Sequence, residues 1–172
     1  MLLALVSATI VLAFVRREGS HPARRVGSAG VTVAIPNGWH SLPEPGPPPG
    51  VGISDPVPRL VVASAPIGFA ADGCHGLGYA FSRTAVALVV MEWVRPTPGS
   101  LPPRPRRFTQ GTLPVRPPPA LECWNGPGGG TEFTDHRRRL DAFVLVGRAA
   151  PAELVRRARQ VLDTLTVTSR AG

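Results

Sequence analysis

Two cysteines and a histidine are the residues in this sequence best suited to covalent chemistry. Cys74 and Cys123 are the only cysteines, and His75 directly follows Cys74. Neighbouring residues on a strand point to opposite sides, so this adjacency does not by itself make a thiol–imidazole dyad. In an exported protein, two cysteines in separate loops predict a disulfide, which would stabilise the fold by about 4 kcal/mol for a closed loop of about 50 residues. Two buried free thiols, or a reactive thiol at Cys74, are the alternatives.

Glu92 is the carboxylate with the most unusual surroundings, because it lies in the apolar stretch 85–94. A buried Glu has a raised pKa and can act as an acid or a base. The interpretation that we favour is that Glu92 lies near the strand end, pairs with an arginine, or faces water.

Three tryptophans are candidate binding residues: Trp39, Trp93 and Trp124. Large aromatic side chains more often belong to the core, and Trp39, which follows the turn sequence Pro36-Asn37-Gly38, is expected to pack under a helix. The three tryptophans therefore either line a pocket or belong to the core.

The basic run Arg137-Arg138-Arg139 is the other candidate binding feature. Near an anionic membrane each charge contributes about 1 kcal/mol, although a solvated hairpin tip is the simpler interpretation. The net charge is +8, all 19 basic residues are arginine, and aromatics make up only 6% of the chain. Abundant Ala, Gly, Pro and Arg indicate a GC-rich genome, and the scattered arginines predict no nucleic-acid partner.

Metal and cofactor motifs are absent from the sequence. The histidines show no paired spacing, and there is no Cys-x-x-Cys. The glycine-rich stretch 126–130 lacks the Lys-Ser/Thr ending of a phosphate loop. We therefore expect no metal and no cofactor. The four histidines are His21, His40, His75 and His136.

The N-terminal stretch 2–15 is apolar apart from Ser7 and Thr9. As a helix this stretch spans about 21 Å, whereas a bilayer core is about 30 Å thick and requires about 20 residues. Residues 1–15 are thus predicted to be a signal peptide or membrane anchor, with a buried core helix as the alternative. The arginines that follow favour a cytoplasmic domain, but the cysteines and long loops favour export. A translation start slightly upstream would add basic residues before the apolar stretch and so reconcile these two orientations. We expect the domain on the extracytoplasmic side.

The remaining chain reads as a linker at 16–29 and one domain at 30–169, with proline-rich loops at 43–58 and 96–107. Alternating or apolar runs predict several strands, and an apolar stripe predicts a helix over about 151–164. Strands followed by one helix predict an α+β fold, in which an antiparallel sheet carries the C-terminal helix on one face and is preceded by one N-terminal apolar helix. The predicted strands are 31–35, 60–65, 85–94, 108–112, 121–124, 131–134 and 140–147.

The chain resembles the PsbP and Mog superfamily pattern. That pattern opens with an apolar strand closed by Pro-x-Gly-Trp, here Ile35-Pro36-Asn37-Gly38-Trp39, and ends with a helix finishing in Leu-Asp-Ser-Leu, here Leu162-Asp163-Thr164-Leu165. It also resembles uncharacterised secreted or anchored proteins of high-GC actinobacteria in Glu122-Cys123 and in the hairpin sequence starting at Phe133. The resemblance covers about residues 30–168 and implies an α/β/α or α+β sandwich without shared catalytic residues.

These observations predict a non-enzymatic, secreted or membrane-anchored envelope module. Its partners would be the membrane, through residues 2–15, and an unknown envelope protein or a small ligand. One alternative is a thiol- or carboxylate-dependent hydrolase using Cys74, His75 and Glu92. The other is a structural spacer whose proline-rich loops resist proteolysis.

Overall fold

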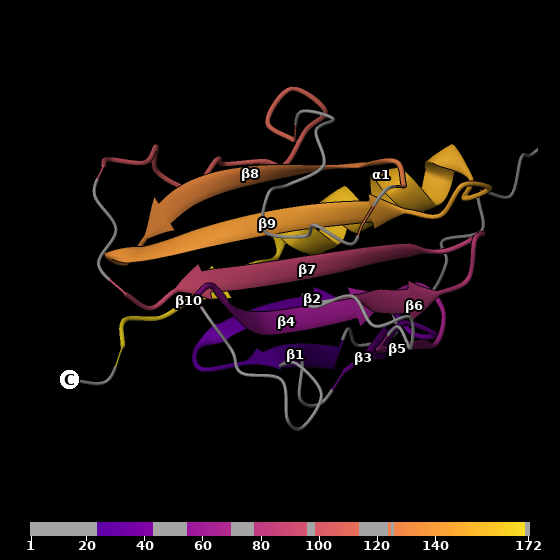
Figure 1. Ribbon diagram of the computed structural model, residues 1–172, viewed down its shortest axis with the longest axis horizontal. Helices are drawn as coiled ribbons and strands as arrows, with labels where there is room; N and C mark the ends of the chain where they lie inside the picture. Colours follow the sequence, from indigo (N-terminus) through magenta and orange to yellow (C-terminus); the bar gives the residue numbers. More distant parts are fainter. Residues whose placement is uncertain are drawn as a thin grey trace, which may run out of the picture.

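Of the residues that the structure describes, 47% lie in strands and 11% are helical, so this part of the protein is mostly β-structure. The computed structural model describes residues 24–42, 55–69, 78–95, 99–113, 124 and 126–170. The strands in these ranges belong to three antiparallel sheets, and the one helix in these ranges lies near the C-terminus of the chain (Figure 1). In chain order the elements are β1 (Arg24–Ser28), β2 (Val31–Ile35), β3 (His40–Ser41), β4 (Val57–Ala63), β5 (Ile67–Phe69), β6 (Tyr79–Phe81), β7 (Val86–Trp93), β8 (Gly128–Asp135), β9 (Arg138–Val146), α1 (Ala152–Asp163) and β10 (Thr166–Val167).

The central sheet has five strands in the order β3-β4-β7-β9-β8. Seven of the eight residues of β7 are buried, as its continuous apolar sequence requires of a strand covered on both faces. β8 and β9 form a long hairpin joined by only two residues, His136 and Arg137. In the register between β7 and β9, Trp93 lies opposite Arg139 and Glu92 lies opposite Leu140. This register decides which polar residues meet at the end of the sheet.

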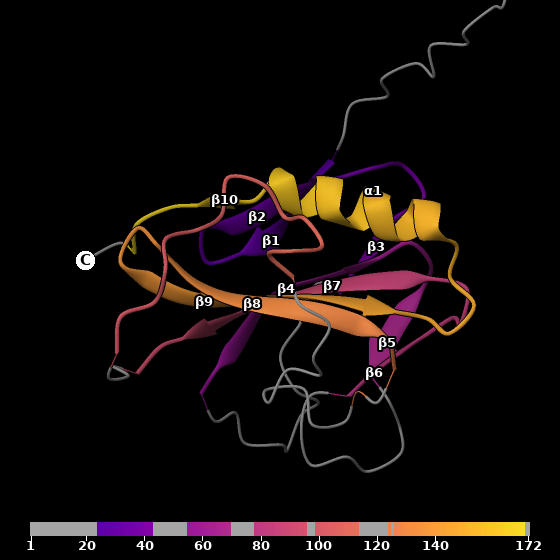
Figure 2. The same ribbon diagram turned by 90° about the horizontal axis from the view of Figure 1, so that it is seen from above.

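One face of the central sheet is covered by α1 and by the three-stranded sheet β1-β2-β10 (Figure 2). Alternate residues of β7, including Leu88 and Val90, form the larger core with Ile35, Ala158 and Leu162. Because strand side chains alternate, Glu92 points to this same side of the sheet. The helix end is tied to β2, since the backbone N–H of Ala34 donates to Thr164 Oγ1 at 2.8 Å.

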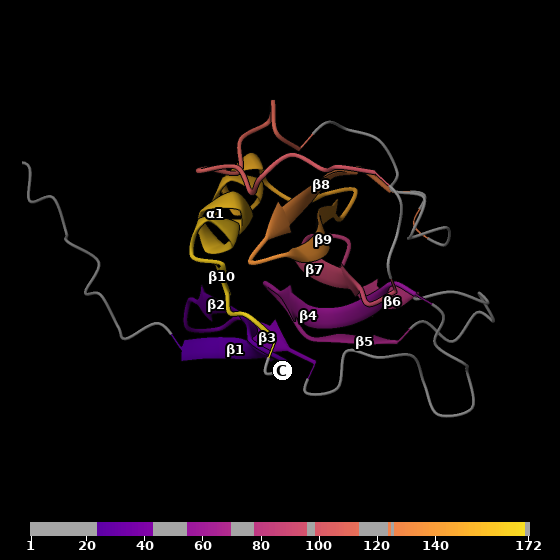
Figure 3. The ribbon, with the colours of Figure 1, turned by 90° about the vertical axis from the view of Figure 1, so that its left-hand side faces the viewer.

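The opposite face is covered by the two-stranded sheet β5-β6, which lies beside β4 and β7 (Figure 3). The smaller core on this side contains Val89, Met91 and Phe143, together with Tyr79 from β6. Trp93 and Asp141 point to this side by the same alternation. The two faces therefore carry different polar residues at the same sheet end.

The predicted α+β class is wrong. The interpretation treated a single sheet as the whole strand content, whereas three sheets are present and the helix is short. Residues 24–28, predicted to be linker, form β1, because the backbone ladder with β2 orders a sequence of low strand propensity. No apolar helix precedes the sheets in the described ranges, and residues 1–15 lie outside them.

Two local predictions also differ from the structure. The predicted strand 108–112 is a turn, because the N–H of Thr109 donates to Thr112 Oγ1 at 2.8 Å and the N–H of Leu113 donates to the Thr109 carbonyl at 3.0 Å. Gly128–Gly130, predicted to be loop, begin β8. The predicted helix over 151–164 corresponds to α1 within one residue at each end.

Candidate functional site

A cleft of about 800 Å³ lies at the end of the central sheet, and we call it the basic cleft. It is formed by the end of β7, the β8–β9 turn, the loop around residues 99–101 and the C-terminal residues 169–170. Three apolar residues line it, Trp93, Val94 and Leu101, which we call the cleft floor, and no carboxylate residue is among the described residues that line it. Five arginines line the cleft: Arg95, Arg137, Arg138, Arg139 and Arg170.

The floor of the basic cleft is held in place by hydrogen bonds. The Asp55 carboxylate accepts the backbone N–H groups of Val94 at 2.7 Å and Arg95 at 2.9 Å, which fixes the chain as it leaves β7. The indole Nε1–H of Trp93 donates to Asp141 Oδ2 at 2.9 Å. The Arg139 guanidinium lies 4.8 Å from the Trp93 ring centre, within the range of a cation–π contact. Trp93 is therefore a preorganised part of the site.

Glu92 lies behind the cleft wall, with no exposed side-chain surface. Its carboxylate accepts from Arg59 Nε at 2.7 Å, from Arg138 Nε and Nη2 at 2.8 and 2.7 Å, and from Arg170 Nε and Nη2 at 3.0 and 2.8 Å. Burial raises the pKa of Glu92, but the arginine hydrogen bonds outweigh it and lower the pKa to about 2. The favoured interpretation of Glu92 as an ion-paired residue is confirmed.

Arg138 is the central member of this network. Its side chain is only 2% exposed, and its Nη1 donates to the carbonyl oxygens of Ala29 at 2.8 Å and Thr168 at 3.0 Å. The network thus connects β7, β9, the β1–β2 turn and the C-terminal segment. A guanidinium that is buried and so fully engaged serves to position the cleft wall rather than to bind a ligand.

The turn that presents Arg137 has an unusual backbone. His136 and Arg137 have φ angles of 47° and 61°, in the left-handed region that two-residue hairpin turns usually fill with Asn and Gly. Such a conformation is uncommon for arginine, because its Cβ atom crowds the backbone there. Arg137 is exposed and makes no side-chain hydrogen bond or ion pair within the part of the chain that the structure describes. Its presence in a left-handed turn has no local structural benefit.

Asp141 is a second buried carboxyl group, on the opposite face of the sheet from Glu92. It is 2% exposed, and Oδ1 has no hydrogen-bond partner. Burial raises the pKa of Asp141 to about 7; the negative charge of Glu132 adds to the increase, and the bond from Trp93 and the charge of Arg139 oppose it. Arg139 Nε is likewise buried without a partner, while its Nη2 bonds Glu132 at 3.0 Å. The two unpaired atoms belong to side chains on the same face of β9.

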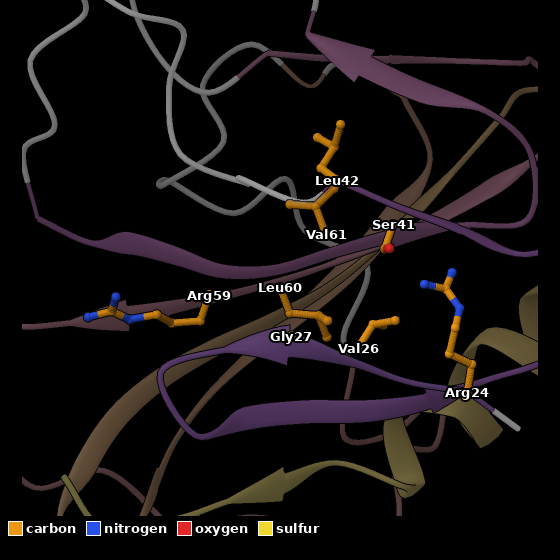
Figure 4. Close-up of a pocket in the computed structure, with 8 residues that line it drawn as sticks. All are labelled: Arg24, Val26, Gly27, Ser41, Leu42, Arg59, Leu60 and Val61. Atoms are coloured by element: carbon orange, nitrogen blue, oxygen red, sulfur yellow. The ribbon is translucent and has the colours of Figure 1, made fainter. Parts of the chain in front are cut away.

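A smaller cavity of about 260 Å³ lies between β1 and β4 (Figure 4). Val26 and Leu60 face each other across it, with Arg24 and Arg59 at its two ends. The guanidinium of Arg59 extends away from the cavity and pairs with Glu92. The cavity is a gap between two sheets and carries no convergent polar groups that would hold a ligand.

The sequence candidates separate into cleft and core residues. Trp93 and the three arginines 137–139 meet at the basic cleft, whereas Trp39 is 8% exposed in the larger core. Trp124 stacks on Phe81 with ring centres 5.2 Å apart and donates its indole N–H to the Pro127 carbonyl. Cys74, His75 and Cys123 lie outside the described residues.

Sequence reasoning missed Arg170 and Arg95 as members of the site. The position of Glu92 in the sequence could have indicated such arginines, because a carboxylate inside an apolar strand requires cationic partners from elsewhere in the chain. The sequence does not reveal which arginines these are, since Arg59 and Arg170 are 33 and 78 residues away from Glu92.

Within the described ranges, no helix is long and apolar enough to cross a membrane. The same ranges hold no group of three or more His, Cys, Asp or Glu side chains suited to a metal ion. No protein family model matches this chain, no curated protein matches it, and no solved structure matches it.

Proposed function

We propose that this protein is a non-enzymatic binding module, secreted or anchored in a membrane through residues 2–15, with its domain on the extracytoplasmic side. The module holds an envelope protein or a small ligand in the basic cleft. The observation that carries the proposal is a cleft of about 800 Å³, a volume typical of ligand sites, that is lined by both apolar residues and five arginines.

The state of Glu92 argues against a hydrolase in which Glu92 is the acid or base. A general acid or base works best with a pKa near the working pH, whereas the pKa of Glu92 is about 2. Its two oxygens already accept five hydrogen bonds from three arginines. A carboxylate in this state supports structure rather than proton transfer.

The proposal is tested by photo-crosslinking in cells of the source organism. A photoreactive amino acid replaces Val94, an exposed residue of the cleft floor, and in a control replaces Arg157, an exposed residue of α1 that does not line the cleft. We expect one discrete adduct from position 94 and none from position 157. A small ligand would instead be retained in native mass spectrometry of the full chain. Absence of both adduct and ligand would contradict the proposal.

The proposed location is tested separately with a membrane-impermeant thiol reagent on intact cells. If the domain is extracytoplasmic and Cys74 is joined to Cys123, both residues become labelled only after reduction. Labelling that needs cell lysis but no reductant would place the domain in the cytoplasm and return Cys74 to consideration as a nucleophile.

A further inference from the structure

We infer that the basic cleft is an oxyanion site, in which Arg137 and Arg170 hold a carboxylate or phosphate group of a ligand whose apolar part lies on the cleft floor. This inference rests on the proposed function and adds the chemical class of the ligand to it.

The available hydrogen-bond donors define the ligand chemistry. All N–H groups of the Arg137 guanidinium are unengaged in the described part of the chain, and Arg170, half-exposed, uses only Nε and Nη2 on Glu92. Guanidinium groups have donors and no acceptors, and their planar fork matches a carboxylate or a phosphate. Within the described lining no carboxylate competes for them. A cationic ligand would meet the charge of the arginines and no carboxylate among the described lining residues.

The ion pairs of Glu92 also leave a net positive charge beside the cleft before any ligand binds. Glu92 contributes one negative charge to three arginines, Arg59, Arg138 and Arg170, so this group retains a surplus of positive charge. Arg170 is the member nearest to solvent, with 50% of its side chain exposed. The Glu92 carboxylate accepts hydrogen bonds from Nε and Nη2 of Arg170, so Nη1 of Arg170 has no partner among the described residues. An anion in the cleft would therefore meet a donor that is already oriented.

The floor indicates that the anion is part of a larger molecule. Val94 is 36% exposed and is the exposed large hydrophobic residue of the described surface. With Trp93 and Leu101 it forms an apolar area beside the arginines. A free inorganic ion leaves this area in water, whereas an anion attached to an apolar group covers it. The preferred ligand is thus amphipathic.

The experiment titrates the full-length protein with benzoate, phenyl phosphate and the neutral control benzyl alcohol, and follows the indole N–H signal of Trp93 by NMR. Vesicles of phosphatidylcholine with and without phosphatidylglycerol form a further arm and show whether a lipid headgroup can supply the anion. The key variant is Arg137→Asn, because Asn tolerates the left-handed turn and removes the guanidinium. The control is Arg157→Gln on the exposed face of α1.

We expect at least one anionic probe to bind the wild type and to lose about tenfold or more in affinity in Arg137→Asn, as the loss of a charged hydrogen bond implies. The variant should keep the melting temperature of the wild type, and Arg157→Gln should bind normally. Equal binding of benzyl alcohol and the anions would overturn the oxyanion inference and leave the cleft as a binding site. Unchanged anion binding in Arg137→Asn would also overturn it. Absence of both the adduct from position 94 and a ligand retained in native mass spectrometry would instead contradict the proposed function.

Discussion

Replacing Glu92 with glutamine is expected to destabilise the fold strongly. The substitution keeps the shape of the side chain but removes the charge that Arg138, only 2% exposed, faces at 2.7 and 2.8 Å. The new amide also places an NH₂ group, a donor, against guanidinium groups, which have donors and no acceptors. The buried charge of Arg138 then loses its anionic partner.

Two independent estimates give the magnitude. Removal of one partner from a buried ion pair costs about 3–5 kcal/mol. The lowering of the Glu92 pKa from 4.5 to about 2 corresponds to about 3 kcal/mol of stability at neutral pH. Since a domain is stable by only about 5–15 kcal/mol, Glu92→Gln removes a large share of the total.

The assay is urea unfolding of the full chain at pH 7, read by far-UV circular dichroism. Glu153→Gln is the matched control, because Glu153 pairs with Arg156 on the helix surface and both side chains are more than half exposed. The control should change the free energy of unfolding by less than about 0.5 kcal/mol. A loss below about 1 kcal/mol for Glu92→Gln would refute the buried-charge argument.

The pH dependence gives the same argument a second test. A carboxylate whose pKa is lower in the folded state stabilises the protein above its unfolded pKa of 4.5. This contribution disappears as the pH falls from 4.5 toward 2. The difference in stability between wild type and Glu92→Gln should therefore narrow over this acidic range, and a constant difference would contradict it.

Three further predictions concern other parts of the structure. Asp141→Asn keeps an acceptor for the Trp93 indole and removes a carboxyl group whose pKa rises from 3.8 to about 7 on folding. The substitution should therefore stabilise the protein by up to about 4 kcal/mol above pH 7 and have no such effect below pH 4. Urea unfolding at pH 4 and pH 8 measures this difference, and an equal effect at both pH values would contradict it. Gly30→Ala places a Cβ 2.1 Å from Thr168 Oγ1 at a φ of 75° and should cost about 1–2 kcal/mol, whereas an unchanged melting temperature would contradict the geometry of the β1–β2 turn. Leu162→Ala empties a fully buried site beneath α1 and should cost about 2–5 kcal/mol in the same assay; a loss below 1 kcal/mol would argue against the packing of α1 on the sheet.

Sequence reasoning succeeded where the signal is local. The apolar stripe and Pro151 indicated α1, and the β8–β9 hairpin followed from two patterned runs around a polar bend. It failed where long-range pairing determines structure. β1 has the sequence Arg-Arg-Val-Gly-Ser and becomes a strand only because β2 supplies its hydrogen bonds. The division into three sheets is a property of pairing and not of any single run.

The candidate site shows the same limit. Trp93 and the arginines 137–139 were identified by residue type, but their meeting depends on the register that sets Trp93 opposite Arg139. A shift of one residue would move Trp93 to the other face of the sheet and separate it from Asp141. Arg170 joins the cleft only through its bond to Glu92, far away in sequence.

The arrangement of charges predicts that Arg137 and Glu92 differ in how much they contribute to stability. Arg138 is buried and bonded to Glu92, Ala29 and Thr168, so its removal affects the whole sheet end. Arg137, its neighbour in the sequence, makes no such contact and occupies a left-handed turn that would be relaxed by Asn. Arg137→Asn should therefore preserve stability, whereas Glu92→Gln should reduce it, and a loss of stability in Arg137→Asn comparable to that in Glu92→Gln would contradict this separation.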